Sequence, residues 1–470
     1  MGNLKYTVYE KSIHKEGRTT VFMIREGEED TLIIQGENPG FEGSLSPEDM
    51  FKAPLNHKNA EILRKLFPFT APSRVLGNER SFGAGDRLGI ASPGHIRLFK
   101  QYDAYPILAQ QSIRELTLTN RTYEDVLDAA SFAVFREGYK KGWGADGDHL
   151  KTAKDIEYAL SLGFTMITLD CSEHIKNNIN DENAPDLPTG CAEKYLNKEF
   201  DIGENVSLKF SEGELKKIAA IYGDAIAFAT EMYNQYFAKG AHSADFEISI
   251  DETATPTTPL QHYFVARELI DGGVSFATMA PRFCGEFQKG IDYIGDLGQF
   301  EKEIKIHAVI ARHFKYKLSI HSGSDKFSVF PFIGKESAGV FHVKTAGTNW
   351  LEAMRVVAAE DPGLYREIHK FAIGSFDEAL KFYHVKADLQ KIPDVDSLQD
   401  QELPELFNQD DSRQLIHITY GLILQKKNAD GSFTFKDRLY KLWREKEEAY
   451  AQALIKHIGR HLDLLGLKKG

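Results

Sequence analysis

Short apolar segments alternate with segments of helical period along most of this 470-residue chain, and this alternation limits the possible folds most strongly. Eight segments have the length and residue types of buried strands. They are 81–85, 105–110, 142–146, 164–170, 246–251, 275–280, 317–321 and 339–344. Helical segments lie between them, including 123–140, 212–236, 260–272 and 297–314. Because strands that alternate with helices form parallel βαβ units, eight repeats predict an α/β fold of the (β/α)₈ TIM-barrel type.

The two ends of the chain have different patterns. Residues 1–75 contain strand-like segments followed by an amphipathic helix, which predicts a small N-terminal β-rich lobe. Its segments are 5–10, 19–25, 31–36 and the helix 56–67. Residues 391–470 contain only helical segments, at 403–407, 413–424 and 438–465. We therefore expect three domains: the lobe, a catalytic barrel at 76–390 and a C-terminal helical extension.

One long polar segment, 175–211, interrupts the barrel pattern after the fourth strand. The segment is polar and is broken by Pro185 and Pro188. Loops of this length are more often functional or disordered than neutral. We expect an enlarged loop here.

Charge and cysteine content exclude several classes of function. The 57 Lys and Arg residues against 69 Asp and Glu give a net charge of −12, which is not the footprint of a nucleic-acid-binding protein. No apolar stretch approaches the roughly 18 residues that a membrane span needs. The first residues lack the apolar core of a signal peptide, and Cys171, Cys191 and Cys284 are too few and too scattered for a disulfide framework. We expect a cytoplasmic protein that acts on a small molecule.

Ionisable and amide side chains follow almost every predicted strand. Active sites of TIM barrels lie at the C-terminal ends of the strands, so these positions are the candidates. They are Asp86, Arg87, Gln110, Gln111, Arg114, Asp146, Asp148, His149, Asp170, Asp251, Glu252, Arg282, His321, Ser322, Ser324, Asp325, Lys326, His342 and Lys344.

Three of the sixteen histidines, His149, His321 and His342, lie at strand ends beside acidic or small polar residues. Strand alternation turns His321 toward the barrel axis, and the same parity turns His342 and Lys344 inward. Neutral imidazoles that converge with carboxylates can bind Zn²⁺, Mn²⁺, Co²⁺ or a similar ion. The alternative is three unrelated polar histidines.

Carboxylates at two strand ends are candidates for proton transfer. The segment GADGDH at 144–149 places Asp148 beside an imidazole, where it is either a catalytic group or the N-cap of the next helix. Asp251 has inward parity and Glu252 follows it, so either is a candidate second acid or base. The alternative for this pair is an acidic turn before Pro256 and Pro259.

Nucleotide-binding motifs are incomplete. The segment GAGDRLG at 83–89 has its last glycine one position late for a dinucleotide loop and lacks the paired acid, so we do not expect NAD. The segment SGSDK at 322–326 is not a P-loop, and its small residues and lysine suit a carboxylate, phosphate or polyol.

Long motifs at the strand ends closely resemble one known family. They are SFGAGDRLGIASPGH, PILAQQSIREL, GWGADGDH, FTMITLDCSEH, ISIDETATPTTP, KGIDYIGDL, SIHSGSDKFSVFP and FHVKTAGT, between about residues 80 and 350. In these segments the chain resembles the tagaturonate/fructuronate epimerases of hexuronate catabolism. The resemblance implies interconversion of D-tagaturonate and D-fructuronate by inversion at C4, with a divalent cation.

The chemistry of such a reaction suggests roles for the candidates. The C4 proton of a 2-keto sugar acid is not α to the carbonyl, so a retro-aldol cleavage and re-addition is the expected route, and it needs a Lewis acid and two proton-transfer groups. We expect His149, His321 and His342 to bind the metal (Mn, Zn, Co or Ni), Asp148 to act as base, and Glu252, or else Asp251, to act as acid. Substrate-binding candidates are Arg87, Gln110, Arg282, Ser324, Asp325, Lys326 and Lys344, of which Arg282, Lys326 and Lys344 would bind the carboxylate.

Two alternatives to this function stay open at the level of sequence. The same site could belong to a metal-dependent aldolase or ketose isomerase acting on a related sugar acid. A barrel of this kind could also be a non-catalytic sugar-acid-binding protein.

Overall fold

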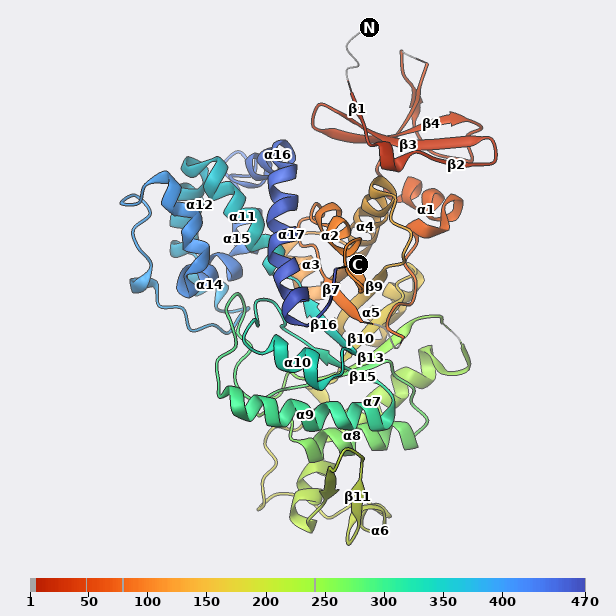
Figure 1. The fold of residues 1–470 in the computed structure, drawn as a ribbon, viewed down its shortest axis with the longest axis vertical. Helices are drawn as coiled ribbons and strands as arrows, with labels where there is room; N and C mark the ends of the chain where they lie inside the picture. Colours follow the sequence, from red (N-terminus) through yellow and green to blue (C-terminus); the bar gives the residue numbers. More distant parts are fainter. Residues whose placement is uncertain (1–5, 48, 78–79, 241, 470) are drawn as a thin grey trace.

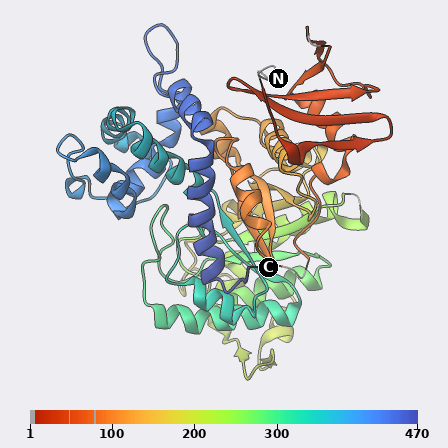
Figure 2. The same ribbon diagram turned by 45° about the horizontal axis from the view of Figure 1, so that its top comes forward.

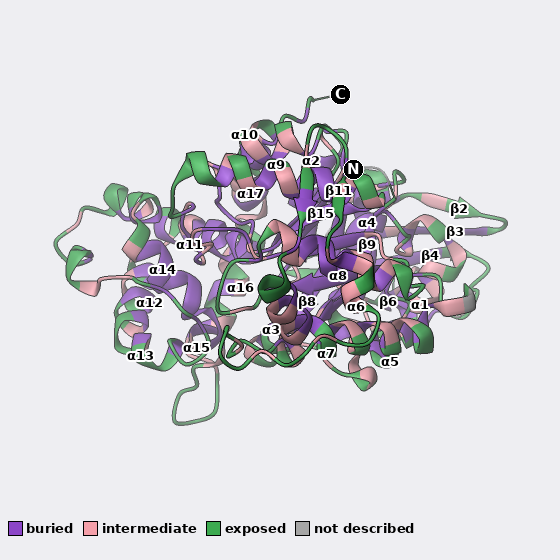
Figure 3. Ribbon diagram, turned by 90° about the horizontal axis from the view of Figure 1, so that it is seen from below, coloured by how far each residue is buried: buried purple, intermediate pink, exposed green. Residues whose placement is uncertain are grey.

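Eight parallel strands close into a barrel at the centre of the molecule, as predicted (Figure 1). The computed structural model describes residues 6–47, 49–77, 80–240 and 242–469. The barrel strands are β7 (Ser81–Ala84), β8 (Tyr105–Ser112), β9 (Gly144–Leu150), β10 (Met166–Asp170), β13 (Asp245–Ile250), β14 (Thr278–Pro281), β15 (Lys317–Ile320) and β16 (Phe341–Thr345). Each strand pairs with the next along the chain, and β16 pairs with β7 to close the barrel. Figure 3 shows β8, β9 and β15 as buried, with helices around them.

The third barrel strand differs from its predicted bounds in a way that matters for the site. β9 begins at Gly144 and continues to Leu150, so Asp148 and His149 belong to the strand instead of following it. The next helix, α5 (Ala153–Ser161), is N-capped by the Thr152 side chain. Asp148 is therefore not a helix cap, and that alternative is excluded.

Outer helices surround the barrel. They are α2 (Ser92–Phe99), α3 (Ile113–Thr119), α4 (Tyr123–Glu137), α5, α7 (Glu212–Tyr236), α8 (Pro259–Asp271), α9 (Leu297–Phe314) and α10 (Phe330–Glu336). Capping boxes define the starts of several, for example Ser211 with Glu214 at α7. The C-terminal helix α17 (Glu447–Leu464) packs against both α2 and α10 (Figure 2). In the ring of outer helices, α17 therefore occupies the position that the helix following β16 would be expected to take.

The N-terminal lobe is an antiparallel sheet with one helix, as predicted. It contains β1 (Thr7–Val8), β2 (His14–Glu16), β3 (Thr19–Glu26), β4 (Glu29–Gly36), β5 (Ser44–Leu45), β6 (Phe51–Pro54) and α1 (His57–Leu66). Lys5, with which the first predicted strand begins, lies outside the described residues. Alternating apolar residues of β3 and β4 pack with Phe132 and Phe135 of α4, which fixes the lobe to the barrel.

The segment 175–211 is a small folded unit. It contains α6 (Cys191–Tyr195) and the hairpin of β11 (Glu199–Asp201) and β12 (Ser207–Lys209). Tyr195 is buried and donates a hydrogen bond to Glu268 of α8. The unit thus packs on the outer helices, and none of its residues lines the cavity described below.

A second apolar cluster forms the helical part of the molecule. Its helices are α11 (Thr348–Glu360), α12 (Pro362–Gly374), α13 (Phe376–Ala379), α14 (Asp410–Ile418), α15 (Tyr420–Gln425) and α16 (Lys436–Glu445). Trp350 and Trp443 pack edge to face in its core. This packing groups α11–α13, which precede residue 391, with the later helices, and the domain limits at 75 and 390 remain predictions. Within the described residues, no helix has both the length and the apolar character that a bilayer span needs.

Candidate active site

A cavity of about 920 Å³ opens at the C-terminal ends of the barrel strands. Most of the predicted site residues line it, which is the expected place for a TIM-barrel active site. These are Arg87, Gln110, Asp148, His149, Asp251, Glu252, Arg282, His321, Ser324 and Lys344. Three others, Asp325, Lys326 and His342, do not line it.

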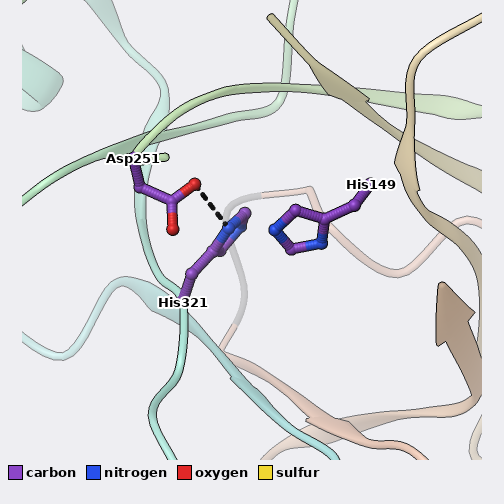
Figure 4. Close-up of side chains that lie close together, drawn as sticks. All are labelled: His149, Asp251 and His321. Atoms are coloured by element: carbon purple, nitrogen blue, oxygen red, sulfur yellow. Dashed lines mark hydrogen bonds and ion pairs between the residues drawn. The ribbon is translucent and has the colours of Figure 1, made fainter. Parts of the chain in front are cut away.

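His149, Asp251 and His321 converge in this cavity (Figure 4). One ligand atom from each lies within 4.8 Å of the others. Nδ1 of His321 lies 3.1 Å from Asp251 Oδ1, while its Nε2 lies 2.8 Å from Glu247 Oε1. Nδ1 of His149 lies 2.8 Å from Asp148 Oδ1. Each imidazole thus has one nitrogen fixed by a carboxylate outside the group, as in carboxylate–histidine–metal sites.

The charges of this group follow from the surrounding carboxylates. Burial lowers the pKa of His321, but Asp251 and Glu247 outweigh it and raise the pKa to about 10. Asp148 similarly raises the pKa of His149 against the effect of burial. A cluster of two imidazoles and a carboxylate fits Zn²⁺ and similar borderline cations in ligand type.

His342, the predicted third metal ligand, lies elsewhere, and Asp251 takes its place in the group. Its Nδ1 lies 3.0 Å from Ser81 Oγ, and burial lowers its pKa to about 3. The predicted inward parity is right, but His342 lies two residues before Lys344 on β16 and belongs to a deeper layer of the barrel interior. Parity determines the face of a strand and not the depth.

Lys344 lies at the floor of the cavity among carboxylates. Its Nζ lies 2.7 Å from Asp146, 2.5 Å from Asp148 and 3.2 Å from Glu247. These charges raise the pKa of Lys344, while Lys344 and His149 lower the pKa of Asp148 well below its usual range despite burial. Because its charge is already offset, Lys344 does not supply the free cation that was predicted for a substrate carboxylate.

The predicted substrate-binding roles of Asp325 and Lys326 are also corrected, because both side chains bond to other parts of the protein and do not line the cavity. Lys326 Nζ donates to the carbonyl oxygens of Gln288, Ile291 and Ser324. Asp325 lies 2.7 Å from Arg413 and 2.5 Å from His457. The backbone of Ser322 and Asp325 has positive φ, so the chain turns sharply here; Ser322 and Ser324 line the cavity, whereas Asp325 and Lys326 do not.

The Asp325 contacts lead to a stability prediction. Asp325→Asn leaves the buried Arg413 guanidinium without its carboxylate, so the free energy of unfolding is expected to fall by about 3 kcal/mol. Urea unfolding measures the change. Asp396→Asn, which removes a half-exposed ion pair with Lys370, is the matched control and should cost under about 1 kcal/mol. Equal stability of the two variants would contradict the structural role of Asp325.

The structure separates Asp251 from Glu252. Asp251 contacts His321 and the Ser249 hydroxyl, as its inward parity predicted. Glu252 is exposed at the cavity wall and forms no hydrogen bond or ion pair with any described residue. Glu252 is therefore the carboxylate of the pair that is free to exchange protons with a bound molecule.

Several other residues line the cavity, although no role for them was predicted from the sequence. They are Arg114, Lys151, Lys289, Tyr383 and His417. Arg114 is among the strand-end residues of the sequence analysis. Lys151 lies two residues after His149, and this proximity is a signal that could have identified it. Tyr383 and His417 come from the helical part, far along the chain, and carried no signal of proximity.

The fold and this cavity define the class of protein: a (β/α)₈-barrel enzyme with a histidine–carboxylate active site. The profile of the tagaturonate epimerase family matches residues 9–465, and the chain belongs to this family. It is 45% identical over 476 residues to the tagaturonate/fructuronate epimerase of Thermotoga maritima, covering 98% of this chain and 97% of that protein.

Solved structures agree with this family. The native fructuronate-tagaturonate epimerase UxaE from Cohnella laeviribosi is 48% identical, with a TM-score of 0.96 over 99% of this chain and 97% of that one. A complex of the same enzyme with one glycerol also has a TM-score of 0.96, over 98% and 97% of the two chains. The resemblance seen in the sequence motifs is thereby confirmed.

Proposed function

We propose that this protein interconverts D-tagaturonate and D-fructuronate by inversion at C4, with a divalent cation. The observation that carries the proposal is the convergence of His149, Asp251 and His321 beside the free carboxylate of Glu252 in one cavity. The activity named for its relatives in Thermotoga maritima and Cohnella laeviribosi supports the choice of substrate.

The cation is proposed from the ligand set. His149, Asp251 and His321 would bind Mn²⁺, Zn²⁺, Co²⁺ or Ni²⁺, with Asp148 and Glu247 orienting the two imidazoles. The chemistry that such an ion supplies is Lewis acidity at a carbonyl oxygen.

The proposed route breaks and re-forms the C3–C4 bond. A base removes the proton of the C4 hydroxyl, the C3–C4 bonding pair moves into an enediolate that includes C2 and C3, and C4 becomes an aldehyde. Rotation of the aldehyde presents its other face, the bond re-forms, and the new C4 alkoxide takes a proton. The product has the same atoms and charge as the substrate and differs only in the configuration at C4; the proton gained by the base and the proton lost by the acid are exchanged with solvent before the next turnover.

Two carboxylates on different strands are available for the proton transfers. Asp148, on β9, is ionised because Lys344 and His149 lower its pKa, so it is the proposed base. Glu252, after β13, is the proposed acid on the return step. Arg87, Gln110, Arg282 and Ser324 line the same cavity and are proposed to contact the substrate.

The test is turnover with and without metal. Protein stripped with a chelator is incubated with D-tagaturonate, alone and with each candidate ion, and the mixture is followed by NMR. Metal-dependent appearance of D-fructuronate is expected. Cleavage fragments or an aldose would favour an aldolase or isomerase, and binding without turnover would favour a non-catalytic protein.

The same experiment in D₂O tests the route. The retro-aldol path keeps the original hydrogen on C4, so no deuterium is expected at that carbon. Deuterium at C4 would show direct deprotonation and overturn the proposed route while leaving the epimerase activity intact.

A further inference from the structure

Three cations in the cavity wall share a single carboxylate. Arg87 donates from Nε and Nη2 to Glu115 Oε1, at 2.8 and 2.5 Å, while its Nη1 is buried without a hydrogen-bond partner. Arg114 and Lys289 line the same cavity and form no ion pair with any residue in the described part of the chain. The cluster therefore carries an excess of positive charge and at least one unused donor.

A pair of tyrosines from the helical part positions the two arginines. The Arg87 guanidinium lies 4.2 Å from the ring centre of Tyr420, and that of Arg114 lies 5.0 Å from the ring centre of Tyr383. The two tyrosine hydroxyls are 3.0 Å apart. Cation–π contacts of this kind orient a guanidinium without neutralising it, so the donors stay available for an anion.

Lys289 connects this cluster with the histidine group. Its Nζ donates to Ser322 Oγ at 3.0 Å, next in sequence to His321. Burial and the positive charges of Arg114 and Arg87 lower the pKa of Lys289, and Glu115 and Glu252 oppose this effect. These interactions place Lys289 between the two arginines and the proposed catalytic groups.

Two other cations of the cavity, Lys344 and Lys151, are already paired with carboxylates. Lys344 contacts three carboxylates, and Lys151 lies within 3.6 Å of Asp170 and 3.4 Å of Glu173. Arg282 donates to the Thr253 carbonyl and so stabilises the loop that carries Glu252. Among the described residues, the cluster of Arg87, Arg114 and Lys289 has one carboxylate ion pair, that of Arg87 with Glu115, for three positive charges.

We propose that Arg87, Arg114 and Lys289 bind the carboxylate of the substrate and thereby select sugar acids over neutral ketoses. This inference rests on the proposed function for the identity of the substrate. In this role the three residues replace Lys326 and Lys344, and Arg282, which donates to the Thr253 carbonyl, is not assigned to the carboxylate. A carboxylate here would accept from Arg87 Nη1 and from the two unpaired cations, in charge-assisted hydrogen bonds.

Binding constants of an acid and its neutral counterpart provide the test. Isothermal titration calorimetry compares D-tagaturonate with D-tagatose, which has a hydroxymethyl group in place of the carboxylate. The wild-type protein is expected to bind the acid at least about 10-fold more tightly. Lys289→Gln should weaken binding of the acid about 10- to 100-fold and change binding of D-tagatose less than about threefold.

Matched variants separate recognition from misfolding. Arg114→Gln changes an exposed side chain and should show the same selective loss as Lys289→Gln. Lys151→Gln removes an equal charge from the same cavity, but one already offset by Asp170 and Glu173, and should weaken the acid less than about threefold. Equal losses for both sugars in Lys289→Gln, or no loss for the acid, would overturn the proposal.

The binding assay is independent of turnover, so the two proposals fail separately. Selective acid binding that Lys289→Gln removes, in a protein without epimerase activity, would support the carboxylate site and reject the proposed reaction. Epimerisation by a wild-type protein that binds both sugars equally would do the reverse.

Discussion

Replacing His321 by glutamine is expected to remove the bound metal and to lower kcat/KM for D-tagaturonate about 10³-fold, or about 4 kcal/mol in barrier. His321 contributes the nitrogen that faces Asp251, and its other nitrogen is fixed by Glu247. Without the imidazole, one of the three proposed ligands is lost and Glu247 loses its partner on that side. Metal content is measured by elemental analysis after dialysis, and activity by NMR.

His342→Gln is the matched control because the sequence assigned both histidines to the metal and the structure separates them. His342 is buried beside Ser81 and outside the ligand group, so this variant is expected to retain one metal ion per chain. Loss of metal from His342→Gln together with retention in His321→Gln would contradict the structural assignment. Circular dichroism confirms that both variants fold.

The barrel could be predicted because its strands are marked twice, by apolar residue type and by regular alternation with helices. Strand parity also placed His321 and Asp251 on the inner face, and His149 was a candidate from its position at a strand end; these three residues do converge. Both inferences depend on the local spacing of apolar and polar residues, which can be read directly from the sequence.

Depth and turn geometry could not be predicted in the same way. His342 has the right parity but lies in a deeper layer, and Asp325 lies outside the cavity lining in a turn where it and Ser322 adopt positive φ. Neither feature has a local sequence signature, since Ser322 and Asp325 are not glycines. The residues at a strand end therefore identify candidate site residues more reliably than they predict which groups each side chain contacts.

Contacts with the helical part were beyond local reasoning altogether. Tyr383 contacts Arg114, and Tyr420 contacts Arg87, although the members of each pair lie more than 250 residues apart in the chain. The packing of α17 against α2, which completes the outer ring of helices, also joins segments far apart in the sequence and could not be predicted from a local pattern. The wall of the cavity thus depends on packing between the barrel and the helical part, which the periodic pattern of neither segment predicts.

Glu252→Gln is expected to lower kcat about 10²- to 10⁴-fold while leaving the metal content unchanged. Glu252 lines the cavity without a protein partner, so the amide removes a proton-transfer group and disturbs no ion pair. Asp251→Asn is expected to differ in kind: it weakens a proposed ligand, so activity and metal fall together.

Glu173→Gln serves as the control for loss of an acidic group at the cavity, because Glu173 is exposed and pairs only loosely with Lys151. Its kcat should stay within about threefold of wild type. Near-wild-type turnover by Glu252→Gln would reject Glu252 as the proton-transfer group and return that role to Asp251. Loss of metal from Glu252→Gln would instead place its carboxylate among the ligands. Measuring kcat and metal content together therefore shows which of the adjacent acids, Asp251 or Glu252, binds the metal and which transfers the proton.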